Sequence, residues 1–95
     1  MIEPANTPSA PEPPEIRLKR LRLRSWRRGT REMDLILGRF ADARLPGLGA
    51  DDLDLYEILL EENDWDLYYW VTGAADAPER LAPLVSEIAG HFRMR

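Results

Sequence analysis

The stretch TREMDLILGRFADAR, residues 30–44, decides the fold of this 95-residue chain. Its apolar residues recur with the period of an α-helix and form one face: Met33, Ile36, Leu37 and Phe40. Thr30 is a good N-cap residue, and Pro46 and Gly47 turn the chain after the last polar residues. The pattern therefore predicts an amphipathic helix from about Thr30 to about Arg44.

Two shorter helices are predicted after that turn. The first begins near Gly49 or Asp51, and its buried side consists of Leu53, Tyr56, Leu59 and Leu60. Asn63 offers a cap for the second, DWDLYYWVTG, which ends at Gly73. The residues of this helix that we expect to face inward are Leu67, Trp70 and Val71.

The last helix carries the most regular apolar stripe in the chain, formed by Leu81, Leu84, Val85, Ile88 and Phe92. Pro83 is compatible with this helix only within the first turn, where a missing backbone N–H costs nothing. We therefore expect either that the helix begins near Ala82 or that residues 79–82 form an irregular lead-in.

The N-terminal part divides into a proline-rich tail and a basic segment. Residues 1–15 hold five of the eight prolines among small polar residues, a composition that buries too little surface to offset chain entropy. We expect a flexible tail over residues 1–15. The apolar residues of 16–26 scatter around a helical wheel, so a strand in LRLRS stays possible, although helix is favoured because everything downstream is helical.

Together these patterns predict an all-α fold, a compact bundle of four to five short helices in one domain over residues 16–95. A domain of this size buries a modest fraction of its surface, so its function should lie on the outside.

Composition excludes several classes of site. The chain has no cysteine, which removes disulfides, thiolate catalysis and cysteine-based zinc sites. His91 is the only histidine, so no histidine pair can bind a metal, and we expect its ring to be solvated. We assign no catalytic residue and no metal ligand.

Location follows from the absence of long apolar stretches. No run approaches eighteen apolar residues and no secretory signal is present, so we expect no membrane association and a bacterial cytoplasmic location. Glu3, Glu12 and Glu15 precede the arginines, unlike a cleaved mitochondrial presequence, which makes the mitochondrial matrix the less favoured address.

The net charge of −4 conceals a strong asymmetry. Eight of the thirteen basic residues lie between Arg17 and Arg31, and eight acidic residues lie between Asp51 and Asp66. Closely spaced arginines release counterions from nucleic acid, so a small nucleic-acid-binding or regulatory protein using residues 17–31 is the alternative function. The overall acidity argues against nucleic acid as a partner, and charge runs are most often solvated helix faces.

The segment RGTREMD, residues 28–34, carries most information about function. Glycine at such a junction permits a positive φ and close approach by another backbone. If residues 28–34 are largely helical, Arg28 and Glu32 form an i, i+4 pair on one edge, with Asp34 round the side. The ordinary alternative is a helix C-cap glycine followed by an exposed salt bridge, and spacing alone favours that alternative.

The aromatic cluster Trp65, Tyr68, Tyr69 and Trp70 could anchor a partner, because large rigid rings supply much of the energy at protein interfaces. Core packing is favoured for at least two members. We assign Trp70 to the core and expect Tyr69 to be the most exposed ring.

Two blocks of the sequence resemble the succinate dehydrogenase assembly factors that promote covalent flavinylation. RSWRRGTREMDLILGRFA is similar to the family's Arg-Gly-x-x-Glu-x-Asp signature, and LYEILLEENDWDLYYWVTG is similar to its second block. The resemblance covers roughly residues 16–93 and implies a five-helix bundle that binds the flavoprotein subunit of succinate dehydrogenase, or of fumarate reductase in some bacteria. It implies partner contacts at Arg27, Arg28, Gly29, Arg31, Glu32 and Asp34.

The resemblance also implies how such a factor acts. In this family a histidine of the flavoprotein, here called the client, is joined to the flavin 8α-methyl carbon in a reaction regarded as autocatalytic in the client. The factor is then no enzyme, binds no cofactor stably, acts on the client's FAD and is monomeric when free. Our hypothesis is that the corner around Gly29 packs against the client's FAD domain, with Arg28 and Glu32 ordering client groups near the flavin.

Overall fold

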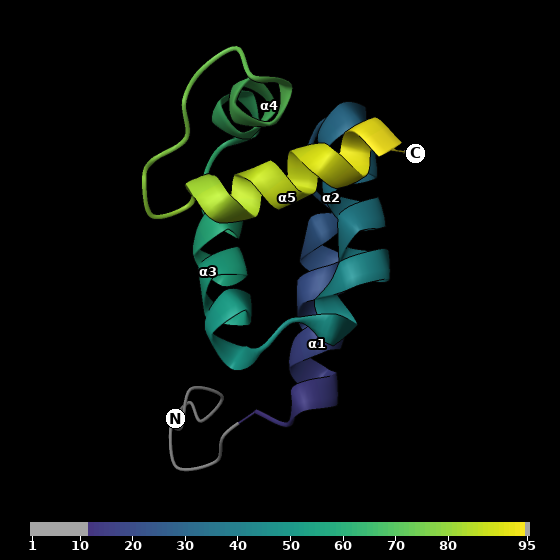
Figure 1. Ribbon diagram of the computed structural model, residues 1–95. Coiled ribbons are helices and arrows are strands. Elements are labelled where there is room, and N and C mark those ends of the chain that lie inside the picture. The colour runs from purple at the N-terminus through teal and green to yellow at the C-terminus, as the bar shows by residue number, and fades with distance from the viewer. Residues whose placement is uncertain (1–11, 95) are drawn as a thin grey trace, which may run out of the picture.

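The computed structural model describes residues 12–94, so most of the expected tail, residues 1–11, lies outside the described residues. Within this range the chain forms five α-helices and a short 3-10 turn and contains no strand (Figure 1). The elements are α1 (Pro14–Ser25), α2 (Arg31–Arg44), η2 (Leu45–Gly47), α3 (Ala50–Leu60), α4 (Asp64–Thr72) and α5 (Ala82–Met94). The expected all-α fold is confirmed, and the possible strand in LRLRS is a helix.

The helix boundaries follow the capping residues. Thr30 Oγ1 accepts from the Met33 N–H at 3.2 Å, and Asn63 Oδ1 accepts from the Asp66 N–H at 2.9 Å. Gly73 ends α4 in the left-handed region, with φ at 86°. These starts and stops agree with the sequence, whereas α1 begins two residues before the predicted boundary because Pro14 suits a first turn.

The helices pack in two groups that α5 joins. In Figure 1, α1 and α2 lie side by side and α3 runs opposite them, while α5 crosses in front. Contacts of α5 with α2, α3 and α4 make it the element that closes the bundle. The helix α4 lies at one end of the molecule, which leaves one of its sides open.

The apolar stripes predicted from the sequence meet in one core. Met33, Ile36, Leu37 and Phe40 of α2 are all buried, as are the inward residues of α5 except Phe92. Leu53, Trp70 and Phe92, which we expected in the core, are only partly buried and pack against its margin. The scattered apolar residues of α1 behave as their spacing suggests, since Leu21 is buried while Ile16 and Leu23 are half exposed.

One polar pair is buried in this core. Ser25 Oγ lies 2.6 Å from the Tyr56 hydroxyl and 2.7 Å from the Leu21 carbonyl oxygen. Each hydroxyl has one proton, so when Ser25 donates to Leu21 the Tyr56 hydroxyl donates to Ser25, and both groups are satisfied. Burial raises the pKa of Tyr56 to about 12, which keeps the phenol protonated. The pair ties α1 to α3.

Ion pairs on the surface reinforce the same contact between α1 and α3. Arg17 lies 2.6 Å from Asp54 and 2.8 Å from Glu57, and Arg20 lies 2.8 Å from both Glu57 and Glu12. Hydrogen bonds from Arg20 and Arg17 lower the pKa of the Glu57 carboxyl from its ordinary value of 4.5, with burial opposing them. The charge asymmetry of the sequence is thus used within the fold.

This lowered pKa gives a prediction for acid unfolding. Because the pKa of Glu57 is depressed in the folded state, its contribution is complete above 4.5 and is lost as pH falls through the folded-state pKa. We expect Glu57→Gln to have a shallower loss of unfolding free energy between neutral pH and about pH 3, measured by urea titration. Glu79→Gln, at an exposed position without an ion pair among the described residues, should follow the parent curve.

The indole of Trp26 packs directly against the backbone of α2. A Cβ atom added at Gly38 would lie 2.3 Å from the Trp26 ring atom Cδ2, closer than real side chains approach. The indole Nε1 also lies 3.3 Å from both carboxylate oxygens of Asp42. Only glycine at position 38 allows the ring to lie there, so this residue fixes how α1 meets α2.

A pair of glycine substitutions tests this contact. Gly38→Ala should lower the unfolding free energy by about 1–2 kcal/mol, because displacing the ring outweighs the gain in helix propensity of about 1 kcal/mol. Gly90→Ala in α5 has open space around the new methyl group and should gain up to about 1 kcal/mol. Urea unfolding of both variants measures the difference, and equal stabilisation would contradict the contact.

Candidate partner-binding site

The bend between α1 and α2 forms an exposed corner of the molecule. Gly29 has φ at 132°, a conformation that other residues rarely adopt, as the sequence predicted. A Cβ atom there would also approach Asp64 Oδ2 to 3.3 Å. The corner around Gly29 therefore depends on glycine for its backbone shape and for the closeness of α4.

Arg28 fastens this corner to the turn between α3 and α4. Its Nε donates to Asp64 Oδ1 at 2.9 Å, its Nη1 donates to the Leu60 carbonyl at 2.6 Å, and its Nη2 donates to the Glu62 carbonyl. The Arg28 and Asp64 side chains are only 11% and 13% exposed. A guanidinium with three acceptors on a separate segment makes a directional link that a lysine could not reproduce.

Asp34 holds the other side of the bend. The backbone N–H of Arg28 donates at 2.6 Å to Oδ1 of Asp34, whose carboxylate lies in the first turn of α2. This position also favours the carboxylate electrostatically, because a helix N-terminus carries partial positive charge. Asp34 thus supports the backbone of the corner, and its side chain is only partly exposed.

The predicted pairing of Arg28 with Glu32 is wrong. Residues 28–30 form a bend and α2 starts at Arg31, so the two side chains are not neighbours on one helix face. The simpler alternative does not hold either, since α1 is capped at Trp26 and the Arg28 ion pair is largely buried. No local spacing signals this arrangement, because Asp64 is 36 residues away in the chain.

The six residues assigned to partner binding lie at this corner but differ in what they can offer. Arg28 and Asp34 are engaged within the fold. The exposed members are Arg27, Gly29, Arg31 and Glu32. Among the described residues no ion pair is made by Arg27, Arg31 or Glu32, so these charges face solvent unpaired.

The basic segment as a whole is largely neutralised. Of its eight cations, five form ion pairs with carboxylates elsewhere in the chain: Arg17, Arg20, Arg22, Arg24 and Arg28. Within residues 12–94 the remaining three, Lys19, Arg27 and Arg31, are exposed without such partners. Few cations are left to contact phosphates.

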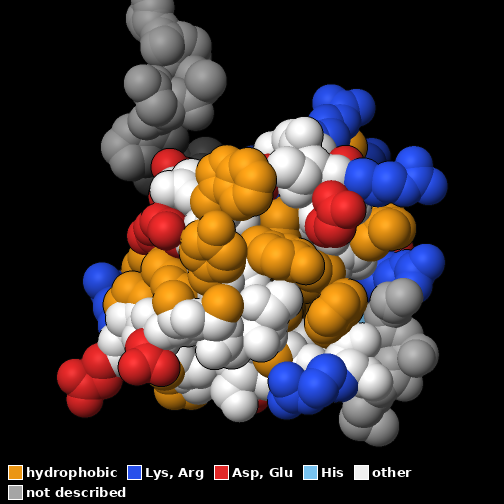
Figure 2. All heavy atoms as spheres, turned by 90° about the horizontal axis from the view of Figure 1, so that it is seen from above, with side chains coloured by type: hydrophobic (Ala, Val, Ile, Leu, Met, Phe, Trp, Pro, Cys, Tyr) orange, Lys and Arg blue, Asp and Glu red, His pale blue; other side chains and the backbone are white. Residues whose placement is uncertain are grey.

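The aromatic residues of α4 form an open surface next to the corner. Trp65 is 68% exposed, Tyr69 45% and Tyr68 37%, so Trp65 and not Tyr69 is the most exposed ring. Trp65 lies about half a turn from the buried Leu67 on the helix, which points it outward. Viewed from the α4 end, hydrophobic side chains gather across the middle of this face with charged side chains at its rim (Figure 2).

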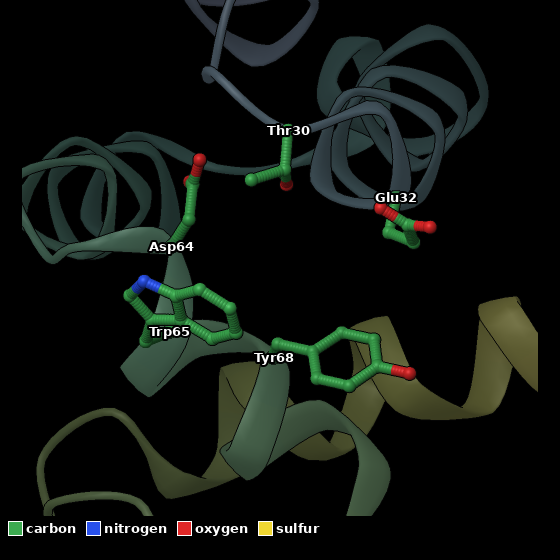
Figure 3. Close-up of a pocket in the computed structure, with 5 residues that line it drawn as sticks. All are labelled: Thr30, Glu32, Asp64, Trp65 and Tyr68. Carbon is green, nitrogen blue, oxygen red and sulfur yellow. The ribbon is translucent and has the colours of Figure 1, made fainter.

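A pocket of about 300 Å³ opens between the start of α2 and α4. Its lining, shown in Figure 3, consists of Thr30, Glu32, Asp64, Trp65 and Tyr68. The two rings lie on the α4 side, Thr30 and Glu32 face them from α2, and Asp64 lies between (Figure 3). We refer to it as the α2/α4 pocket.

Other candidate features are modest. Over residues 12–94 no three acidic, histidine or cysteine side chains cluster as metal ligands would, and none of the helices there is both long and apolar enough to cross a bilayer. His91 differs from expectation, because its ring is half-buried and meets Phe40 edge-on at 5.9 Å between ring centres.

Comparison with known proteins identifies the family. The family described as flavinator of succinate dehydrogenase matches residues 19–92, which include the corner, α4 and the pocket. The chain belongs to this family. The resemblance seen in the sequence is therefore confirmed.

Curated relatives are named as succinate dehydrogenase assembly factors. The flavinator-family chain is 46% identical over 71 residues to succinate dehydrogenase assembly factor 2, mitochondrial, of Penicillium rubens, covering 73% of this chain and 22% of the relative. It is 47% identical over 58 residues to the Debaryomyces hansenii protein, covering 61% and 41%, and 43% identical over 70 residues to assembly factor 2-B of Drosophila mojavensis, covering 72% and 45%. The chain spans less than half the length of these relatives.

The relatives correct the predicted location. Their names place these relatives in mitochondria, which contradicts the expectation of a bacterial cytoplasmic protein. Glu3, Glu12 and Glu15 precede residues 19–92, which match the family. The composition of a folded flavinator domain does not encode its cellular compartment.

The Arg28 link can be tested by a conservative substitution. Arg28→Lys keeps the charge but cannot reach three acceptors, so we expect a loss of about 1–3 kcal/mol in unfolding free energy. Arg27→Lys, at the exposed neighbouring position, should change stability by less than about 0.5 kcal/mol. Urea unfolding of both variants decides the matter, and equal stabilities would show that the corner does not depend on the guanidinium.

Proposed function

We propose that this chain binds the flavoprotein subunit of succinate dehydrogenase and promotes the covalent attachment of FAD to it, acting as an assembly factor and not as an enzyme. The observation that carries the proposal is the family match over residues 19–92, which spans the whole corner and α4. The exposed charges at the corner supply a surface on which a client could dock.

The α2/α4 pocket suits a protein contact better than FAD. Its volume of about 300 Å³ is at the small end for ligand pockets, and its lining includes the carboxylates of Glu32 and Asp64. Those carboxylates would repel the pyrophosphate of a dinucleotide. The residues present therefore do not fit FAD, which supports a role in which the client holds the flavin and carries out the bond formation.

The contribution of this chain is then positional. Arg28 and Asp34 fix the corner, and Gly29 presents backbone without a side chain, so a client backbone can approach closely. Arg31 and Glu32, both exposed in the first turn of α2, present opposite charges next to this bend. A rigid, charged surface orients client groups near the flavin at low entropic cost, which is how preorganised electrostatics lowers a barrier.

A second client and the oligomeric state of the free chain belong to the same proposal. The fumarate reductase flavoprotein is a further client, because it would present the same flavin chemistry to the corner. The free chain is monomeric, with the rings that line the α2/α4 pocket reserved for the client. The competing function, nucleic-acid binding through residues 17–31, is disfavoured because five of the eight cations there are paired internally.

Co-expression with the flavoprotein subunit tests the proposal. Flavin fluorescence that survives denaturing electrophoresis should rise when this chain is present. Arg27→Glu combined with Arg31→Glu should reduce that fluorescence by about tenfold, because the charges that orient the client are reversed. Arg39→Glu reverses an exposed charge on α2 away from the corner and should leave fluorescence unchanged.

Stability of the charge-reversed protein must be measured alongside. Gly29→Leu would strain a positive φ and crowd Asp64, so its failure would not separate binding from folding. Unchanged unfolding with lost fluorescence supports the proposal. Fluorescence that does not depend on the presence of the parent chain contradicts it.

A further inference from the structure

The α2/α4 pocket has two walls of different chemistry. The rings of Trp65 and Tyr68 form one side, the Glu32 carboxylate lies on the other, and the Asp64 carboxylate lies between them (Figure 3). Among residues 12–94 no Lys or Arg belongs to its lining. A pocket that combines aromatic faces with carboxylates selects for positive charge on a planar or apolar body.

The negative charge of the pocket is only partly compensated. Arg28 neutralises Asp64 through Oδ1, and the donors of this guanidinium are further occupied by two backbone carbonyls. Glu32 is exposed and has no ion-pair partner in the described part of the chain. One carboxylate thus remains at the pocket rim without a cation.

The aromatic wall is equally unpartnered. Trp65 leaves 68% of its surface in water, and its indole N–H has no acceptor within residues 12–94. An apolar occupant would cover this ring but strip water from Glu32 without replacing it, at a cost in free energy. An anion would be repelled. A cation satisfies both walls, because it is attracted by ring faces and by the carboxylate.

We infer that the α2/α4 pocket receives an arginine side chain of the client flavoprotein, whose guanidinium stacks on Trp65 and Tyr68 and pairs with Glu32. The inference rests on the proposed function for the identity of the partner. A guanidinium is planar, weakly hydrated and able to bond a carboxylate through two N–H groups, so it fits this combination better than an ammonium. The pocket adjoins Thr30 and hence the corner, so one client surface can occupy both.

Affinity for the purified flavoprotein subunit provides the first test. Trp65→Ala and Glu32→Gln should each weaken binding about tenfold, as loss of a stacked or paired cation does. Trp65→Phe should recover part of the loss, because a ring face is restored. The Glu32→Gln complex should also be less sensitive to added salt than the parent complex.

Matched variants separate the pocket from its surroundings. Tyr69→Ala removes an exposed ring of the same helix that does not line the pocket, and Glu79→Gln removes an exposed carboxylate in the loop before α5. Both should bind the flavoprotein like the parent chain.

A small probe tests the pocket without the client. Titration of the chain with N-acetyl-arginine amide should shift the NMR signal of the Trp65 indole N–H, whereas the uncharged citrulline analogue should not. The shift should disappear in Glu32→Gln. These measurements read the chemistry of the pocket directly.

The possible results divide cleanly. Weakened binding by both pocket variants with intact controls, together with an arginine-specific shift, supports the inference. Parent-like affinity of Trp65→Ala, or equal shifts with arginine and citrulline probes, overturns it while leaving the proposed function intact. Failure of the parent chain to bind the flavoprotein subunit overturns the proposed function and the arginine assignment with it.

Discussion

The structure depends on one arginine that spans two parts of the chain. Arg28 leaves the bend after α1 and satisfies two backbone carbonyls and the Asp64 carboxylate at the turn between α3 and α4. Carbonyls at a helix C-terminus need partners, and here a side chain from a distant segment supplies them. The same contact sets the corner around Gly29 and brings α4 beside α2, which creates the α2/α4 pocket.

The charges of the basic segment, residues 17–31, mostly serve the fold. The basic residues of α1 pair with the acidic residues of α3, so a sequence that looks strongly polarised becomes a set of internal ion pairs. Exposed pairs of this kind contribute little stability singly, yet among the described residues they leave only Lys19, Arg27 and Arg31 of the basic segment without an ion pair. Arg27 and Arg31 lie with the unpaired Glu32 where the family signature lies.

Much of the fold could be predicted because helix periodicity and caps are local signals. Met33 to Phe40, Thr30, Asn63 and Gly73 all behave as their sequence positions indicate. The site was harder. The partner of Arg28 is 36 residues away, so no spacing rule connects it to Asp64, and the helical pairing with Glu32 was the wrong local solution. Trp65 was named as a possible anchor, but Tyr69 was expected to be the more exposed ring, because the exposure of each ring depends on where α4 lies against the bundle.

The contacts of Arg28 with residues 60–64 determine when the corner can form during synthesis of the chain. The complete signature is contained in residues 28–34, but its shape requires acceptors at Leu60, Glu62 and Asp64. A nascent or truncated chain that ended within α3 would carry every signature residue and still lack the surface. The corner is therefore completed late, when the second half of the chain has joined the first.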